Sequence, residues 1–335
     1  MLTVLMATYN GAQKLPDALD AYQGLETPAG GWRLIIVDNG STDATKDIIA
    51  TFASLLPITY RYEPKKGKNI ALNTALPSVF GDLVVFTDDD VLPRADWLRQ
   101  LRRVADAQSA YAMFAGTIRP KWERPPEPWI LNWVPLSPTY AVLDPDQDGA
   151  CDPRLVFGAN MTVRSEVFEK GYRFDESVGP KSGRYRRYMG GETEFTVRLA
   201  KAGYQAWHCK DAVVYHMIRA EQMTRPWVLR RAVYFGRGEY RLETRDKEDS
   251  LASLLWPARP LPFQLLAQRL RLHYARWAGD DARRFKAQWR WNVLVGRAQE
   301  AWLALRKKGF PGPLGQHDPA VLDRTPALRE DDAAP

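Results

Sequence analysis

Leu83-Val84-Val85-Phe86-Thr87-Asp88-Asp89-Asp90 is the stretch that decides the fold class of this chain. Its apolar residues are typical of a strand buried on both faces, and three aspartates follow at once. Clustered carboxylates repel one another unless a cation lies among them, and oxygen ligands favour Mg²⁺ or Mn²⁺. The stretch therefore predicts a divalent-metal site at a strand end, with a solvated acidic turn as the alternative.

Two earlier apolar runs also end in polar residues. Residues 2–6 lead into Thr8-Tyr9-Asn10, and residues 34–37 lead into Asp38-Asn39, with amphipathic helical patterns between the runs. Such alternation predicts an α/β fold with a mostly parallel central sheet flanked by helices. Ligands bind these sheets beyond the carboxyl ends of the strands, so the polar strand ends together define a candidate site.

The pattern beyond the aspartates is less regular. Pro93 suits the first turn of a helix whose apolar face includes Trp97 and Leu101. Residues 118–153 hold eight prolines, which predict a long structured loop, and in a compact domain such loops are more often functional than idle. After a Gly- and Arg-rich loop, Glu192 begins a helix, and residues 212–216 form a last predicted strand.

Composition narrows the class of protein. The 335 residues include two cysteines, Cys151 and Cys209, which favour a reducing compartment over a disulfide framework or zinc cluster. Neither a signal segment nor an apolar run of membrane-spanning length is present, so we expect a cytoplasmic protein. The absence of a phosphate-loop signature and of a dinucleotide-binding glycine motif argues against a P-loop NTPase and a dinucleotide oxidoreductase.

The net charge of +7 is unevenly distributed. Residues 259–308 carry twelve Lys or Arg and three acids, a net +9 that leaves −2 for the rest of the chain. Basic helices with Trp277, Trp289, Trp291 and Trp302 predict peripheral attachment to an anionic membrane surface, on the inner face of the cell membrane. The alternative is that these helices pack as ordinary domain structure with their arginines in water.

Six short motifs, in order and at fitting spacings, resemble those of family 2 glycosyltransferases, over about residues 2–240. They are Thr8-Tyr9-Asn10-Gly11, Val37-Asp38-Asn39-Gly40-Ser41-Thr42-Asp43, Gly67-Lys68 with Ala71-Leu72-Asn73, Phe86-Thr87-Asp88-Asp89-Asp90, Gly158-Ala159-Asn160-Met161 and Gly191-Glu192-Thr193-Glu194-Phe195. The resemblance implies a GT-A fold and an inverting transfer of sugar from a nucleotide diphosphate sugar, most commonly a UDP-sugar. The acceptor would be a hydroxyl, for example on a lipid-linked or envelope glycan.

The resemblance also implies roles for the residues at the strand ends. Asp38 would pair with the base of the nucleotide, or else only cap the next helix, while Tyr9 would stack on the nucleoside. Asp88 and Asp90 would form the Asp-x-Asp pair, with Asp90 on the Mn²⁺ or Mg²⁺ ion and Asp88 toward ribose or sugar. Lys68 would either meet phosphate or remain a solvated lysine. The full expected nucleotide-sugar set is Thr8, Tyr9, Asn10, Asp38, Lys68, Asp88 and Asp89.

Glu192 matches the family's catalytic base, and Glu194 is the alternative. The two lie two positions apart on a helix and point in different directions, so only one can enter the site; the other would pair with Arg198. The resemblance makes His216 a third metal ligand beside Asp88 and Asp90, or a structural histidine. Four downstream arginines could reach the diphosphate or form a solvated helix face: Arg219, Arg225, Arg230 and Arg231.

We expect four segments from these patterns. Residues 1–110 form a nucleotide-sugar-binding half and residues 111–225 the acceptor-binding and catalytic half of one domain. Residues 226–308 form a basic helical extension, and residues 309–335 a disordered tail. Three rival readings remain: a nucleotidyltransferase-like enzyme, a basic nucleic-acid-binding protein, and an inactive binding module. The acidic strand ends favour an enzyme that binds no nucleic acid.

Overall fold

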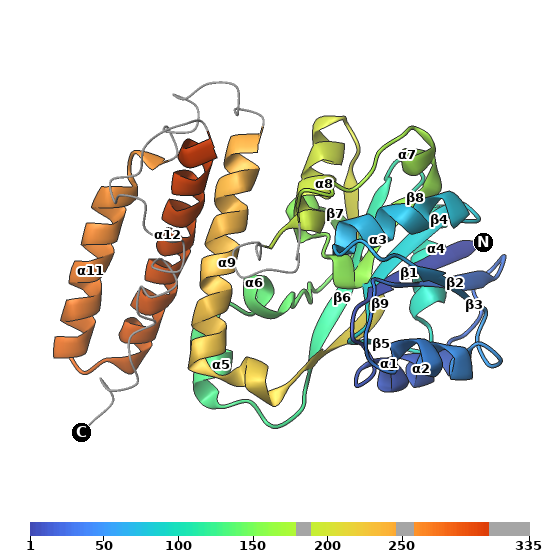
Figure 1. The fold of residues 1–335 in the computed structure, drawn as a ribbon, viewed down its shortest axis with the longest axis horizontal. Coiled ribbons are helices and arrows are strands. Elements are labelled where there is room, and N and C mark those ends of the chain that lie inside the picture. The colour runs from blue at the N-terminus through green and yellow to red at the C-terminus, as the bar shows by residue number, and fades with distance from the viewer. Residues whose placement is uncertain (179–188, 246–257, 308–335) are drawn as a thin grey trace. The chain divides into compact units, whose positions relative to one another are not determined.

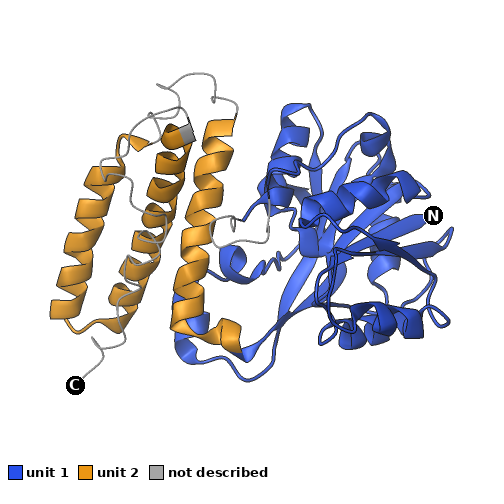
Figure 2. Cartoon of the chain, in the orientation of Figure 1, with its two compact units in different colours: residues 1–220 blue, residues 221–335 orange. Residues whose placement is uncertain are grey.

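The structure, a computed structural model, describes residues 1–178, 189–245 and 258–307. The chain divides into two compact units, Met1–Ala220 and Glu221–Pro335 (Figure 2). The Gly- and Arg-rich loop expected over residues 179–191 lies largely outside the described residues, and the tail expected over residues 309–335 lies wholly outside them.

Unit 1 is built on a central sheet flanked by helices (Figure 1). The described residues form nine strands in the order β3-β2-β1-β4-β8-β6-β9-β5, with β7 paired to β9. The first four strands pair in parallel: β1 (Leu2–Thr8), β2 (Trp32–Asp38), β3 (Ile58–Tyr62) and β4 (Leu83–Asp88). This half follows directly from the continuous apolar runs in the sequence.

The other half of the sheet mixes directions. The strand β9 (Ala206–Ile218) pairs in parallel with β6 (Met113–Trp122), but β4–β8, β6–β8, β5–β9 and β7–β9 are antiparallel. The remaining short strands are β5 (Val91–Pro93), β7 (Gly149–Cys151) and β8 (Met161–Arg164). The expected α/β architecture is confirmed, with antiparallel strands added to its parallel half.

Three local predictions were wrong. Pro93 ends β5, and the helix expected to begin there, α4 (Trp97–Ala107), begins later. The proline-rich segment 118–153 contains the end of β6 and two short helices. Pro120 lies in the part of β6 beyond residues 113–115, where β8 no longer pairs with this strand. There β6 has a long strand partner, β9, on one side only, so a proline is tolerated as it is on an edge strand. The last strand begins at Ala206, before the predicted residue 212.

Helices cover both faces of the sheet, and strand residues alternate between the two cores. One core joins Leu2, Val4 and Met6 to helices that include α1 and α4; the other joins Leu5 and Ile35 to α3 and α8. The α-helices of unit 1 are α1 (Leu15–Gln23), α2 (Thr45–Phe52), α3 (Lys68–Ala75), α4, α5 (Pro128–Trp133), α6 (Leu136–Tyr140), α7 (Ser165–Glu169) and α8 (Gly191–Lys201). Short 3₁₀ turns occupy Leu76–Ser78, Pro153–Leu155, Gly158–Asn160 and Ala220–Met223.

Unit 2 contains the helices α9 (Arg225–Thr244), α11 (Leu261–Trp277) and α12 (Asp281–Lys307). The helices α9 and α12 approach closely at two glycines: a Cβ on Gly236 would lie 2.0 Å from the carbonyl oxygen of Val293. Buried Glu300 accepts hydrogen bonds from Arg237 (2.9 Å) and Arg241 (2.5 Å). These two hydrogen bonds join α9 to α12 inside unit 2.

The four tryptophans of the basic segment lie in different environments. Trp277 is exposed, Trp289 is buried, and Trp291 and Trp302 are half-buried. Within residues 1–178, 189–245 and 258–307, no helix is both long and apolar enough to span a bilayer.

Candidate active site

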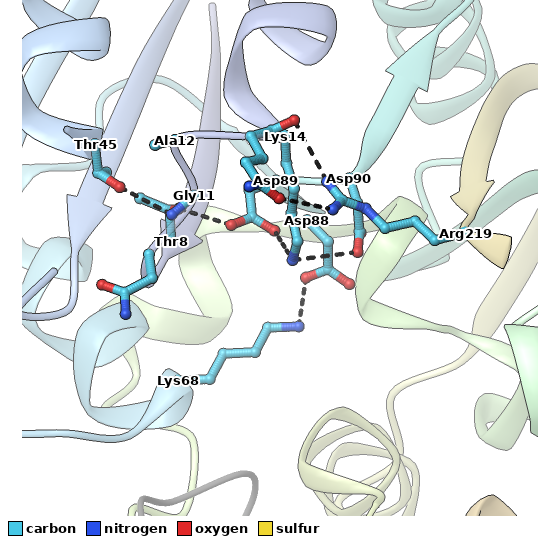
Figure 3. Close-up of polar contacts among 12 residues, drawn as sticks. Thr8, Gly11, Ala12, Lys14, Thr45, Lys68, Asp88, Asp89, Asp90 and Arg219 are labelled. Carbon is cyan, nitrogen blue, oxygen red and sulfur yellow. Dashed lines mark hydrogen bonds and ion pairs between the residues drawn. The ribbon is translucent and has the colours of Figure 1, made fainter. Parts of the chain in front are cut away.

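The polar ends of three parallel strands meet at one edge of the sheet. The strand register places Thr8 beside Asp38, and Ala7 beside Asp88. The aspartates and the turn after β1 consequently form one cluster, which Figure 3 shows together with two lysines that point into it. The sequence-based prediction that these strand ends lie together agrees with this register.

Asp89 ties the end of β4 to the turn after β1. Its Oδ2 accepts a hydrogen bond of 2.7 Å from the Thr8 hydroxyl, and its Oδ1 lies 3.2 Å from the ammonium of Lys14 (Figure 3). Asp89 is buried, so these partners offset the cost of removing its charge from water. Lys14 also lies 3.6 Å from Asp90 Oδ2, although no sequence pattern had indicated a role for this lysine.

The turn after β1 presents Tyr9 and Asn10. Asn10 adopts a left-handed backbone (φ +49°), and its side chain accepts a 2.9 Å hydrogen bond from the Thr42 amide. The Tyr9 side chain is half exposed, with the Lys66 ammonium 3.8 Å from the centre of its ring. An aromatic surface therefore lies at the expected nucleoside position.

Asp38 is only 2% exposed, and both of its oxygens accept hydrogen bonds. Oδ1 accepts from the Ser41 amide at 2.8 Å, and Oδ2 accepts from the Tyr60 hydroxyl at 3.1 Å. Burial and the nearby Asp38 carboxylate raise the pKa of Tyr60 to about 12. Tyr60 lies on the neighbouring strand β3, so sequence spacing did not reveal it.

Lys68 joins the strand-end aspartates to the start of α8. Its Nζ lies 2.6 Å from Asp88 Oδ1 and 2.6 Å from Glu192 Oε1, although Glu192 is 124 residues further along the chain. Burial lowers the pKa of Lys68, but the two carboxylates more than offset this and hold its pKa above the usual range. Lys68 is therefore a charged bridge rather than a solvated surface lysine.

The helix α8 presents its two glutamates in different directions. Glu194 is buried and accepts a 2.9 Å hydrogen bond from Arg198, as the sequence predicted for the glutamate outside the site. Glu192 lies against Gly158, where an added Cβ would be 2.6 Å from its Oε1. Of the two candidates, Glu192 is the one that the structure brings to the aspartates.

Asp90 faces His216 across the pair of strands β5 and β9. His216 Nε2 lies 3.5 Å from Asp90 Oδ1, and its Nδ1 lies 2.7 Å from the carbonyl oxygen of Tyr140. Burial opposes charge on both groups, but their mutual attraction dominates, lowering the pKa of Asp90 and raising that of His216. Because a carbonyl oxygen can only accept, Nδ1 carries a proton, and a charged His216 presents its Nε2–H to Asp90.

These donors suit a divalent metal that takes further ligands from a substrate. A histidine that binds a backbone carbonyl through one nitrogen and faces a carboxylate with the other is arranged as metal ligands commonly are. Among the residues that the structure describes, no group of three His, Cys, Asp or Glu side chains converges closely enough to hold a metal alone. Mg²⁺ and Mn²⁺ often take one or two carboxylates together with phosphate oxygens.

The four arginines that were predicted to reach the diphosphate do not all belong to the same unit. Arg219 lies in unit 1, with one guanidinium nitrogen 3.4 Å from the side-chain oxygen of Gln13 and another 3.4 Å from its carbonyl oxygen. The other three, Arg225, Arg230 and Arg231, belong to α9 of unit 2.

Asn160, from the fifth motif, has a structural position. It is fully buried, donates hydrogen bonds to the carbonyls of Thr117 (2.9 Å) and Ala212 (2.8 Å), and accepts one from the Trp97 indole (2.8 Å). Asn160 thus fixes β6, β9 and α4 behind the strand ends.

Two known glycosyltransferases are similar to this chain in sequence. Glycosyltransferase AglE of Haloferax volcanii is 30% identical over 224 residues, 65% of this chain and 67% of that protein. A pre-mycofactocin glycosyltransferase of Mycobacterium tuberculosis is 25% identical over 240 residues, 70% of this chain but 46% of the relative.

Two solved structures show the fold. The mannosyltransferase PcManGT from Pyrobaculum calidifontis, in complex with GDP-Man and Mn²⁺, superposes with a TM-score of 0.61 at 22% identity, over 90% of this chain and 87% of that one. Residues 1–349 of S. aureus TarS, in complex with UDP-GlcNAc, give a TM-score of 0.51 at 15% identity, over 92% of each chain.

A family profile gives the classification. The profile described as glycosyl transferase family 2 matches residues 3–171, half of the chain and all of the strand ends that carry the aspartates. The fold is of the GT-A type, and nucleotidyltransferase and non-enzymatic readings are set aside. This chain therefore belongs to glycosyl transferase family 2 and is a glycosyltransferase.

Proposed function

We propose that this enzyme transfers a sugar, with inversion, from a nucleotide diphosphate sugar to an acceptor hydroxyl, and that Glu192 is its base. The observation that carries the proposal is the Lys68 bridge, in which one ammonium group contacts both Asp88 and Glu192. A candidate base and a candidate donor-binding carboxylate consequently lie within the span of one small charged group. An acceptor hydroxyl at Glu192 would be close to a donor sugar held near Asp88.

Glu192 would remove the acceptor proton while the acceptor oxygen attacks the anomeric carbon. The bond from that carbon to the diphosphate oxygen breaks on the opposite face, and the nucleoside diphosphate departs with the electron pair. A carboxylate that is paired with an ammonium is a weaker base, because the paired charge stabilises its deprotonated form. We infer that the donor diphosphate draws Lys68 away from Glu192, which frees the base only when donor is bound.

Mn²⁺ or Mg²⁺ is the proposed cofactor, held by Asp90, Asp88 and His216 together with the donor phosphates. Bound there, the metal would stabilise charge on the departing diphosphate. The support is the donor set described above, in which His216 Nε2 faces Asp90. Asp89 contacts Thr8 and Lys14 and so holds the turn after β1 in place. Through this turn it would position the residues that bind the donor.

The nucleoside would lie along residues 7–10, with Tyr9 against its rings and Asp38 accepting a hydrogen bond from its base. Both oxygens of Asp38 have protein partners, but each carboxylate oxygen can accept a second hydrogen bond. UDP is the first choice of donor nucleotide. PcManGT is described with GDP-Man and TarS with UDP-GlcNAc, so both bases are tested.

The acceptor is proposed to be a glycan or lipid-linked glycan that reaches the site past residues 118–153. In this segment Trp122 packs edge-on against Tyr140, whose carbonyl holds His216. Cys151 and Cys209 are both free, which fits a reducing compartment, and we place the enzyme in the cytoplasm on that basis.

A thermal-shift panel of UDP, GDP, CDP and dTDP, each with and without Mn²⁺, tests the proposal. We expect one nucleotide to raise the melting temperature substantially, and only when Mn²⁺ is present, because the metal takes ligands from both protein and diphosphate. Equal stabilisation with and without the metal would contradict the metal site. Heparin retention that falls with salt, without any nucleotide response, would instead favour a nucleic-acid partner.

A further inference from the structure

The helix α11 exposes a continuous stripe of large hydrophobic side chains. Five of the eleven exposed large hydrophobic residues in the described parts of the chain lie on this one helix. They are Phe263, Leu266, Leu270, Tyr274 and Trp277. Their spacing of three and four residues places all five along one face, because residues three and four apart are neighbours on a helix.

The stripe is distinct from the face that packs inside unit 2. Leu261, Gln268, Leu272 and Ala275 are buried, and the Gln268 amide donates a 3.2 Å hydrogen bond to the Ala287 carbonyl of α12. At 100° per residue these positions lie on the opposite side of α11 from the stripe. Figure 1 shows α11 beside α12 within the helical unit. An α11 that only packed on α12 would have no need of an outward apolar face.

The charged side chains on α11 itself all have one sign. From residue 259 to residue 279 the sequence contains no Asp or Glu, while Arg269 and Arg271 are exposed on opposite flanks of the stripe. Tyr274 and Trp277 make a ring contact, with centroids 6.1 Å apart, at the C-terminal end of the helix. Aromatic residues of this kind favour the headgroup level of a bilayer, and arginines favour anionic headgroups.

We propose that the outward stripe of α11 docks this enzyme on an anionic lipid surface, with α11 lying in the plane of the interface. The five hydrophobic side chains enter the boundary between headgroups and acyl chains, and Arg269 and Arg271 contact lipid phosphates. A second copy of the chain fits the surface less well, because pairing two such stripes would bring arginines against arginines. A nucleic acid would meet the arginines but leave the stripe in water.

The proposal narrows the expectation that the whole basic segment is the membrane contact. Trp289 is buried, and Glu300 is surrounded by Arg237 and Arg241, so these groups serve the interior of unit 2. Docking through α11 needs no donor, metal or acceptor. Its test is therefore independent of the function proposed for the site in unit 1.

Flotation of the full chain with lipid vesicles tests the docking. The vesicles are pure phosphatidylcholine or a one-to-one mixture with phosphatidylglycerol, each at low and high salt. We expect binding to the anionic vesicles that weakens with salt. Leu266→Asn with Leu270→Asn should weaken it at least ~10-fold by removing apolar area at unchanged charge. Arg269→Gln with Arg271→Gln should weaken it by about fivefold for each arginine replaced.

Matched controls use exposed residues of unit 1. Leu55 is 62% exposed and Leu270 is 63% exposed, so Leu55→Asn removes an equally exposed leucine and should leave vesicle binding unchanged. Lys46→Gln removes an exposed positive charge from unit 1 and should also leave vesicle binding unchanged. Brominated lipid should quench tryptophan fluorescence in the parent and markedly less in Trp277→Phe, which places α11 itself at the lipid.

Two results would overturn the proposal. One is a parent protein that does not bind anionic vesicles at low salt. The other is a concentration-dependent dimer, measured by light scattering, that Leu270→Asn abolishes while vesicle binding persists. That outcome would assign the stripe to a second copy of the chain.

Discussion

Gly158 lies directly against Glu192: a Cβ at position 158 would be 2.6 Å from Glu192 Oε1 and 2.7 Å from its Cγ. The glycine therefore leaves the space that the carboxylate occupies beside Lys68. Because Glu192 has a flexible side chain, an alanine at this position would displace the carboxylate rather than the backbone. Gly158 thus determines where the proposed base lies.

Gly158→Ala should lower kcat by about 100-fold, the effect expected for a misplacement of about 1 Å. Donor affinity and melting temperature should change little, because the displaced group is a side-chain end. Gly149→Ala is the control, since an added Cβ there meets nothing within 4 Å and should leave kcat unchanged. Full activity of Gly158→Ala would contradict the role of Glu192 placement.

Glu192→Gln should bind donor about as well as the parent but turn over at least ~100-fold more slowly, the low end for a lost general base. Glu194→Gln replaces a buried charge that pairs with Arg198 at 2.9 Å, so it should cost roughly 1.5–3 kcal/mol of stability. Single-turnover rates and urea unfolding separate the two effects. A dead Glu194→Gln beside an active Glu192→Gln would reverse the assignment.

Asp90→Asn should abolish Mn²⁺-dependent stabilisation by nucleotide, because a neutral amide is a poor ligand and no longer attracts His216. The fold should persist, as Asp90 lies just past the end of a strand. Calorimetric titration of Mn²⁺ with nucleotide measures the loss, and exposed Asp17→Asn is the control. Retained metal-dependent binding in Asp90→Asn would place the metal elsewhere.

The ion pair of His216 with Asp90 should make metal-free stability depend on pH. The pKa of His216 is raised in the folded protein, so folded protein holds a proton that the unfolded chain releases near pH 6.5. This contribution is fully present below about pH 6.5 and is lost as pH rises through the raised folded-state pKa.

Chemical unfolding in EDTA across pH 5–9, for the parent and His216→Gln, measures that contribution by difference. Subtraction also removes the effect of His208, whose pKa is lowered by burial. We expect the stability advantage of the parent over His216→Gln to shrink with rising pH. An advantage that grows with pH would mean that the folded protein prefers neutral His216.

The sequence was sufficient for the parallel half of the sheet and for its polar edge. The strands β1, β2 and β4 are continuous apolar runs, and in a parallel sheet their carboxyl ends must meet, so Thr8, Asp38 and Asp88 could be grouped without a structure. The sequence reduced the candidates for the base to Glu192 and Glu194 but could not choose between them. The choice depends on how α8 is rotated about its axis, which decides which glutamate faces Gly158 and Lys68.

The sequence did not predict which side chains reach the site from neighbouring strands and turns, or which short strands pair in an antiparallel direction. Tyr60 reaches Asp38 only through the pairing of β2 with β3, and Lys14 reaches Asp89 only through the turn after β1. The strand β5 is only three residues long and depends on its pairing with β9. So short a strand leaves no strand pattern in the sequence, and Pro93 was therefore predicted to begin a helix. Such features depend on tertiary contacts and leave no periodic signal in the sequence.

Asn160 and Gly116 lie in contact behind the strand ends, and substitutions at either position should lower stability rather than act directly on catalysis. Asn160→Ala leaves the buried Trp97 indole N–H and the Thr117 and Ala212 carbonyls without their partner, at a cost of at least ~3 kcal/mol. Gly116→Ala should also destabilise strongly, because its Cβ would lie 2.1 Å from Asn160 Nδ2. In the Asn160→Ala background, however, Gly116→Ala meets no amide and should cost much less, which a double-mutant cycle in urea measures as coupling. Exposed Asn132→Ala is the control, and additive costs in the cycle would show that the two residues do not share this space.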